Sequence, residues 1–571
     1  MLRRLALSLW LSAPTLVGAQ QADLILTNGR LWTGDSLKPR AEAVAILGDR
    51  ILAVGSRDDV LATRGPKTVV RDMGGRFVAP GFIDNHTHFA QAGALLTGVN
   101  LLDVADAATL VRRVREARDR LPRAAWIVGG EWGAYEAWTQ GATGRDTAAG
   151  ATAKPVFAPQ RSLIDSITPE SPALLSKWDR STYLANGRAL AIAGATCQWD
   201  GVECAGGTPT GRLTPAAADR VRALIPPKPL EQRLIESRTA LKHLAELGVT
   251  TIHDITSPEQ FEVYQELKRR GELTLRVYGR PMLDKWEALR AVGIRHGFGD
   301  DWIKVGGLKG FVDGIMGNSS ARFYEPYLTS GKLGDWRPMM EPAGNMLKLL
   351  FGADSAGHWP QVHAIGDHAI DTLLTMMETV MRVNGPKERR WRVIHTQVIR
   401  GPEVAQRMAR LGLIAEVQPY HAIDDMRWME PRIGKRARWA YAFKTLQNAG
   451  VRLSFGSDWP GTNAAWYTAS PLTGMYAAVT RQTLGGEPQG GWYPEERVDL
   501  ETALRAYTVN NAWVAGEEKS KGRLAPRYLA DISVVDRDPF EVAPSVLKDL
   551  RVLLTIVGGR VVYEAPQRTV P

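Results

Sequence analysis

The sequence predicts an α/β fold, a parallel sheet or barrel accompanied by a small β domain that both ends of the chain build. In the middle of the chain, amphipathic segments that end in glycine alternate with short apolar segments that end in polar residues. This alternation is typical of βα units. Near both ends, short apolar stretches are separated by glycine-containing turns, as in DLILTNGRLWTG and VLLTIVGGRVVYE, which favours antiparallel strands.

The first residues predict export. Arg3 and Arg4 precede an apolar run of about a dozen residues, and the small-residue segment Val17-Gly18-Ala19 follows. We therefore expect a secretory signal peptide over 1–19 and a periplasmic or secreted protein. An uncleaved anchor is less favoured because a bilayer span needs about 20 apolar residues. No later segment is long and apolar enough to span a membrane after cleavage.

The mature chain divides into three expected parts. Residues 20–78 and 518–571 carry the terminal β-strand patterns and are assigned to one composite β domain. Residues 79–517 carry the βα units, such as EQRLIESRTALKHLAELG followed by VTTIHDI. Between 100 and 229 the alternation gives way to Trp-, Gly- and Pro-rich sequence, which predicts an inserted segment that caps the barrel.

Composition narrows the class of protein. The 571 residues carry a formal charge of +10, but the basic residues are scattered and no basic motif is interleaved with aromatic residues, so we expect no nucleic-acid partner. Cys197 and Cys204 are the only cysteines. In an exported protein they could close a small disulfide loop, and two free thiols are the alternative.

Ionisable residues follow the ends of several predicted strands, where barrel enzymes carry their active sites. His86 and His88 stand two apart after the apolar run VAPGFID, so both imidazoles leave the strand on the same side. Later strand ends supply Lys309 in GGLKGFVDG, His363 in VHAIGDH, His395 in VIHTQ and Asp458 in FGSDWP. Neutral imidazole and carboxylate oxygen are good zinc ligands, so these residues together predict a metal site.

The segments PGFIDNHTHF, ELGVTTIHD, LKGFVDG, HAIGD, FGSDWP and LADISVVDRDP resemble the amidohydrolase superfamily, in particular its YtcJ-like, amidohydrolase-3 group. The resemblance implies a (β/α)8 TIM-like barrel with a composite β-sandwich domain from both termini and an insertion after the first barrel strand. It also implies one or two divalent metal ions, usually zinc. The implied metal ligands are His86, His88, Lys309, His363, His395 and Asp458.

Lys309 matches a lysine that such enzymes often carboxylate on Nζ, which turns the cation into an anionic ligand. Lys304 in DWIKVGG is the competing lysine. On a continuous strand, two residues that are five apart face opposite sides, so at most one of these lysines enters the barrel. The match to the family pattern favours Lys309.

The expected activity is metal-dependent hydrolysis of a non-peptide C–N bond in an amide or formamide-like small molecule. Metal-activated hydroxide would attack the carbonyl, with Asp458 taking and returning the proton. A deaminase or cyclic-amide hydrolase is the alternative enzyme, and a catalytically silent ligand-binding barrel is the alternative of another class. We leave open whether the protein forms a homodimer. Two further histidines, His253 and His421, lie near strand ends. We expect His253 to be structural or to lie behind the ligands. For His421, core packing and contact with substrate are equally favoured.

Overall fold

The computed structural model describes residues 20–102, 104–133, 157–178, 180–461 and 468–566. The predicted signal peptide over 1–19 therefore lies outside the described residues. Within the described ranges, no helix has both the length and the apolar character that a membrane crossing requires.

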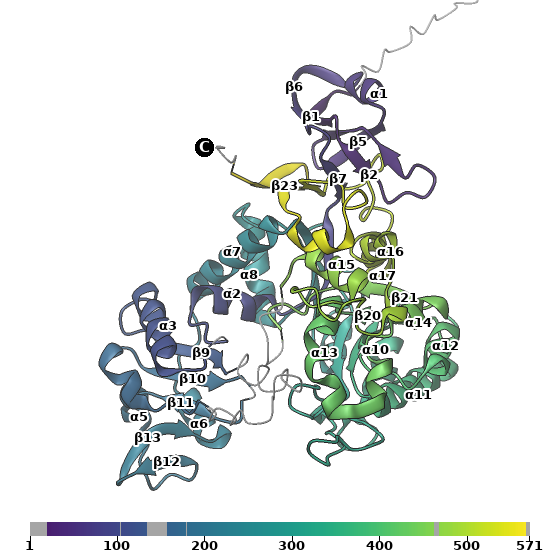
Figure 1. The fold of residues 1–571 in the computed structure, drawn as a ribbon. Coiled ribbons are helices and arrows are strands. Elements are labelled where there is room, and N and C mark those ends of the chain that lie inside the picture. The colour runs from purple at the N-terminus through teal and green to yellow at the C-terminus, as the bar shows by residue number, and fades with distance from the viewer. Residues whose placement is uncertain (1–19, 103, 134–156, 179, 462–467, 567–571) are drawn as a thin grey trace, which may run out of the picture.

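Two parallel sheets form the centre of the molecule (Figure 1). The first has the order β16-β15-β14-β8, and the second has the order β17-β18-β19-β20-β21. The first sheet comprises β8 (Phe82–Thr87), β14 (Val249–Ile255), β15 (Arg276–Arg280) and β16 (Ile303–Val305). The second comprises β17 (Leu308–Phe311), β18 (Pro360–Ala364), β19 (Arg392–His395), β20 (Ile414–Val417) and β21 (Arg452–Phe455).

Main-chain hydrogen bonds join the two sheets at both of their ends. The Asp458 nitrogen, beyond β21, donates to the His86 carbonyl in β8 over 2.8 Å. At the other junction, the Lys309 nitrogen in β17 donates to the carbonyl of Pro281, just after β15, also over 2.8 Å. The carboxyl ends of the first and last parallel strands are thereby brought side by side.

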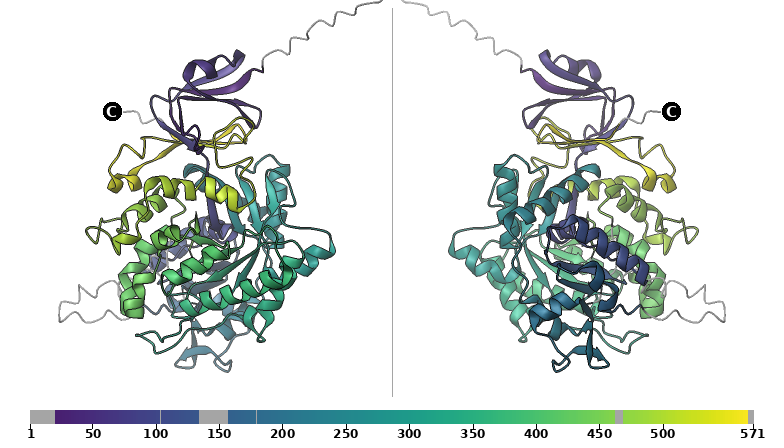
Figure 2. Two further views of the ribbon diagram at one scale, coloured as in Figure 1. Left: turned by 90° about the vertical axis from the view of Figure 1, so that its right-hand side faces the viewer. Right: turned by 90° about the vertical axis from the view of Figure 1, so that its left-hand side faces the viewer.

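Amphipathic helices pack against these sheets, and Figure 2 shows them around the strands. In α11, Ile370, Leu373, Leu374 and Met377 recur at helical spacing and are buried, so their stripe faces the core. The helices are α7 (Leu230–Glu246), α8 (Pro258–Arg269), α9 (Trp286–Ala291), α10 (Asn345–Ser355), α11 (Asp367–Asn384), α12 (Pro402–Arg410), α13 (Pro419–Ile433), α14 (Phe443–Asn448), α15 (Pro471–Thr480), α16 (Leu500–Ala506) and α17 (Val509–Val514).

Strands from both ends of the chain share one sheet, at the top of Figure 1. Its order is β24-β23-β22-β7-β2-β3, and β22 pairs antiparallel with β7 in the register Val534 to Val78. A second sheet, β5-β4-β1-β6, lies beside it and shares a buried cluster that includes Leu26, Val44 and Ile556. The strands are β1 (Ala22–Thr27), β2 (Arg30–Trp32), β3 (Arg40–Ala41), β4 (Ala43–Leu47), β5 (Arg50–Gly55), β6 (Arg64–Asp72), β7 (Phe77–Pro80), β22 (Ile532–Val535), β23 (Val552–Val557) and β24 (Arg560–Glu564).

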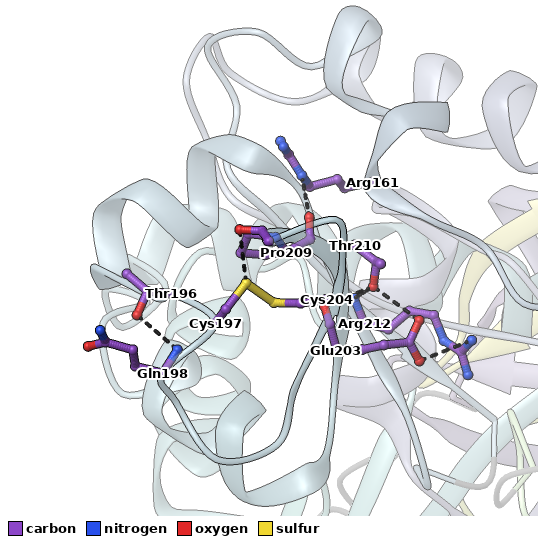
Figure 3. The surroundings of a disulfide bond; sticks show 10 residues. Arg161, Thr196, Cys197, Gln198, Glu203, Cys204, Pro209, Thr210 and Arg212 are labelled. Atoms are coloured by element: carbon purple, nitrogen blue, oxygen red, sulfur yellow. Dashed lines mark hydrogen bonds and ion pairs between the residues drawn. A yellow bond between two sulfur atoms is a disulfide. The ribbon is translucent and has the colours of Figure 1, made fainter.

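After β8 and α2 (Phe89–Thr97), the chain builds a separate five-stranded sheet with the order β12-β13-β11-β10-β9. Its strands are β9 (Ile127–Trp132), β10 (Ala173–Lys177), β11 (Tyr183–Ala185), β12 (Val202–Ala205) and β13 (Thr208–Leu213), with helices α3 (Ala107–Arg120), α5 (Gly187–Ala193) and α6 (Pro215–Arg222). All of these elements fall within 100–229. Cys197 and Cys204 form a disulfide at its exposed edge (Figure 3), so the two cysteines are bonded and are not free thiols.

Candidate metal centre

His86 and His88 converge on Asp458. His86 lies in β8, whose six residues are all buried, and His88 follows where β8 gives way to α2. Nε2 of His86 lies 3.3 Å from Asp458 Oδ1, and Nε2 of His88 lies 3.0 Å from the same oxygen. Both imidazoles therefore leave the strand toward one carboxylate, as their two-residue spacing predicts.

A glycine lets the segment that carries Asp458 approach β8. A Cβ atom at Gly456 would lie 2.1 Å from Asn85 Oδ1 and 2.8 Å from the His86 nitrogen, closer than real Cβ contacts. Asp458 has φ of +60°, and His395 has φ of +71°, a region that non-glycine residues rarely occupy. Such conformations cost about 1–3 kcal/mol each and concentrate at functional sites.

One group of three side chains has the spacing of a metal site. Within the described part of the chain, ligand atoms from His86, His395 and Asp458 all lie within 4.8 Å of one another, and all three residues are buried. His363 packs edge-on against His395 with ring centroids 4.6 Å apart. Because Nε2 of His363 lies 2.9 Å from the carbonyl of Gly314, its Nδ1 is the nitrogen left for another contact.

The two candidate lysines have different surroundings. Nζ of Lys309 is buried, and no hydrogen bond from the described residues reaches it. Burial, together with the charge of Arg280, lowers the pKa of Lys309 to about 7. Lys304 instead pairs with Glu517, with Nζ 2.7 Å from Oε1. Of these two lysines, only Lys309 therefore has a buried amine without a hydrogen-bond partner among the described residues.

The unsatisfied atoms at this centre fit a divalent cation. In the described structure, His86 Nε2, Lys309 Nζ and both Asp458 carboxylate oxygens are buried and make no well-formed hydrogen bond. Buried polar atoms of this kind are costly unless something binds them. Burial and Lys309 lower the pKa of His86 to about 3, and burial and His363 lower that of His395 well below its usual value. Both imidazoles are thus neutral at pH 7, as metal ligation requires.

Sequence reasoning missed the groups that hold these ligands in place. Nδ1 of His86 lies 2.8 Å from Oε1 of Glu416 in β20, and the guanidinium groups of Arg280 and Arg392 bind the same carboxylate over 2.8 and 2.9 Å. Nδ1 of His395 lies 2.7 Å from Gln418 Oε1. A glutamate inside the apolar strand IAEV was the available signal, because a buried charge is rare unless it is paired.

His253 and His421 also have definite places. Nδ1 of His253 lies 2.9 Å from Arg392, so this histidine belongs to the polar layer behind the ligands. His421 lies in the first turn of α13 and lines a cavity with His395 and Asp458, with its ring 6.4 Å from that of His395. His421 therefore lies at the cavity beside the candidate ligands.

The parallel sheets with their helices, and the buried His-His-Asp cluster at the strand ends, define a metal-dependent hydrolase. A family model described as the amidohydrolase family matches residues 69–563. The chain therefore belongs to the amidohydrolase family, which confirms the resemblance drawn from its motifs, and it is a hydrolase of carbon–nitrogen bonds.

Full-length relatives agree with this assignment. Protein LONG AFTER FAR-RED 3 of Arabidopsis thaliana is 31% identical over 95% of this chain and 92% of its own length. The putative amidohydrolase YtcJ of Bacillus subtilis (strain 168) is 28% identical over 92% of this chain and 96% of its own length. N-substituted formamide deformylase of Arthrobacter pascens is 27% identical over 95% of this chain and 99% of its own length.

A solved structure has the same fold. The crystal structure of an uncharacterized metal-dependent hydrolase from Pyrococcus furiosus superposes with a TM-score of 0.71 and 25% identity. The match covers 91% of this chain and 100% of the other. The fold is accordingly of the TIM-barrel type in the α/β class.

Proposed function

We propose that this enzyme hydrolyses the C–N bond of small non-peptide amides, with formamide-like compounds as the first substrates to test. This proposal rests mainly on a narrow cavity of about 30 Å³ beside His395 and Asp458. That space holds two or three water-sized groups, which suits an acyl group as small as formyl. Similarity to the N-substituted formamide deformylase of Arthrobacter pascens supports the same substrate class.

His86, His395 and Asp458 would hold a divalent ion, and we propose zinc because two imidazoles and a carboxylate suit it. His88, His363 and Lys309 are the further ligands we propose if the centre binds two ions. When bound, such an ion polarises a carbonyl and acidifies water. Glu416 and Gln418 would fix which nitrogen of His86 and of His395 faces the ion.

Asp458 would move the proton. Burial alone would raise the pKa of its carboxyl, but His86 and His88 hold that pKa well below its usual value. The carboxylate is therefore unprotonated at neutral pH and can take a proton from the attacking water. It can then return that proton to the leaving nitrogen.

We propose that Nζ of Lys309 is carboxylated. Carbon dioxide adds to a neutral amine, and the lowered pKa of Lys309 supplies one near pH 7. Carboxylation, with release of one proton, would turn this buried amine, which lacks a hydrogen-bond partner among the described residues, into an anionic group that could bind a metal ion. An electron-density map of the metal-loaded protein that shows no extra density on Nζ would contradict this proposal.

Metal analysis together with a substrate panel tests the proposed function. The purified mature protein should contain a divalent metal and hydrolyse N-substituted formamides or other small amides, and a chelator should abolish the activity. Esters, amidines and cyclic amides belong in the same panel, because preferred turnover of an amidine or cyclic amide would favour the deaminase or cyclic-amide alternative. Absence of metal, with neither stabilisation nor activation by added zinc, would refute the hydrolase mechanism.

Three further proposals concern the whole molecule. The junction hydrogen bonds of Asp458 and Lys309 support closure of the two parallel sheets into one (β/α)8 barrel. The shared terminal sheet supports a composite β-sandwich domain. Export is supported by the basic and apolar order of 1–19 and by the Cys197–Cys204 disulfide, since disulfides persist in oxidising compartments. A homodimer stays a prediction for light scattering to test.

A further inference from the structure

A second carboxylate lines the active-site cavity. Asp425 of α13 borders the same space as His395 and Asp458, and only 4% of its surface is exposed. Ile315, Met316, Ile365 and Trp428 supply apolar walls to this cavity. A buried carboxylate oxygen is costly unless a hydrogen-bonding group completes it.

Among the described residues, hydrogen bonds reach only one oxygen of Asp425. Gln397 Nε2 donates to Oδ2 over 2.9 Å, and the Tyr441 hydroxyl donates to the same oxygen. No hydrogen bond from the described residues reaches Oδ1, and this atom is not among the fully enclosed ones. The two donors thus fix the carboxylate through Oδ2 and leave Oδ1 without a donor among the described residues, on a side chain that lines the cavity.

The two arginines near Asp425, Arg427 and Arg432, bind other groups. Arg427 pairs with the adjacent Asp424, and Arg432 donates to the carbonyl of Met316 over 2.6 Å. Burial raises the pKa of Asp425 to about 7, in keeping with a carboxylate that has too few partners. No residue in the described ranges therefore satisfies Oδ1.

We propose that Asp425 Oδ1 accepts the N–H of the scissile amide, which makes the enzyme selective for amides that carry a hydrogen on nitrogen. At a pH well above 7 the carboxylate of Asp425 is ionised and can only accept hydrogen bonds, and the amide group of an N-alkyl formamide offers one N–H donor, so the substrates are compared at such a pH. This inference rests on the proposed amide hydrolysis. It gives Asp425 the role of a specificity-determining residue that touches substrate.

The Asp425→Asn substitution reverses the polarity of the contact. Because Gln397 and Tyr441 both donate to Oδ2, the asparagine carbonyl oxygen would take that place. The NH₂ group would then face the cavity where Oδ1 was, and would present a donor to the substrate N–H. The shape of the side chain is almost unchanged, so the substitution tests charge and polarity.

The test compares two matched substrates, an N-alkyl formamide and the alkyl formate that has oxygen in place of N–H. In Asp425→Asn, kcat/KM for the formamide should fall about 10- to 100-fold, the value of a hydrogen bond to a charged group. The formate ester should change less than about threefold. Asp424→Asn, a neighbouring carboxylate bound to Arg427, should leave the amide-to-ester ratio unchanged.

Tyr441→Phe provides a second variant, because it removes one anchor of Asp425 and keeps the carboxylate. It should lower the amide-to-ester ratio in the same direction by a smaller factor. Equal losses on both substrates, or an unchanged ratio in Asp425→Asn, would overturn the inference while amide hydrolysis by the wild type stands. If the wild type hydrolyses neither substrate, the proposed function fails and the inference fails with it.

Discussion

The contact between Glu416 and His86 gives the sharpest prediction for the metal centre. Glu416 is fully buried and accepts from Arg280, Arg392 and the ring of His86. Glu416→Gln keeps the length of the side chain and removes its charge. Two buried guanidinium groups then lack their carboxylate, and His86 loses the acceptor that fixes its ring.

Two quantities should change. Removing one partner from a buried ion pair costs about 3–5 kcal/mol, so the free energy of unfolding of the metal-free protein should fall by roughly that amount. Loss of the group behind a histidine ligand lowers metal affinity about 10- to 100-fold. Urea denaturation measures the first quantity, and zinc titration against a competing chelator measures the second.

Glu388→Gln is the matched control. Glu388 pairs with Arg390 over 2.6 Å, but its side chain is 68% exposed, so the same substitution should cost less than about 1 kcal/mol and leave metal affinity unchanged. If Glu416→Gln destabilises no more than this control and binds zinc as tightly as the wild type, Glu416 does not position His86.

Three other variants test the site and the fold. Asp458→Asn should retain most of the metal, measured by elemental analysis, while kcat falls about 10²- to 10⁴-fold, and unchanged turnover would remove the proton-transfer role. The second variant concerns Glu517. Burial raises the pKa of its carboxyl, but the charges of Lys521 and Lys304 outweigh burial and lower this pKa to about 2. This lowered pKa stabilises the fold above about pH 4.5, and the contribution of ~3 kcal/mol is lost as pH falls toward 2. The stability difference between wild type and Glu517→Gln should therefore shrink over that window in urea titrations, and a constant difference would contradict the assignment. Opening the short loop with Cys197→Ser should cost about 2 kcal/mol of unfolding free energy without loss of metal, and loss of metal would show that the insertion supports the centre.

The sequence was sufficient to predict the residues that follow the parallel strands. His86, His395 and Asp458 each end an apolar run, and parallel strands place their carboxyl ends together, so their meeting needed no knowledge of the rest of the fold. The family pattern favoured Lys309 over Lys304, but the argument from spacing assumed one continuous strand, whereas Lys304 lies in β16 and Lys309 in β17. The different partners of the two lysines could not be predicted from the sequence.

The groups around the ligands could not be predicted in the same way. Glu416 and Arg280 are 136 positions apart, and their ion pair depends on the tilt and register of strands that no local pattern specifies. Asp425 and Gln397 meet because α13 packs over the strand ends, and the sequence places them only on different elements. Periodicity gives the face of each element, whereas these contacts depend on how the elements pack.

Pairing of β7 with β22 has a consequence for how the protein matures. β7 is synthesised long before its partner β22, so one hydrogen-bonding edge of β7 stays unpaired until β22 has been made. Such an edge can pair with other chains. Loss of β22, β23 and β24 should therefore leave β7 prone to pair with other chains and aggregate even where the metal ligands are intact, because the order of synthesis delays closure of the sheet.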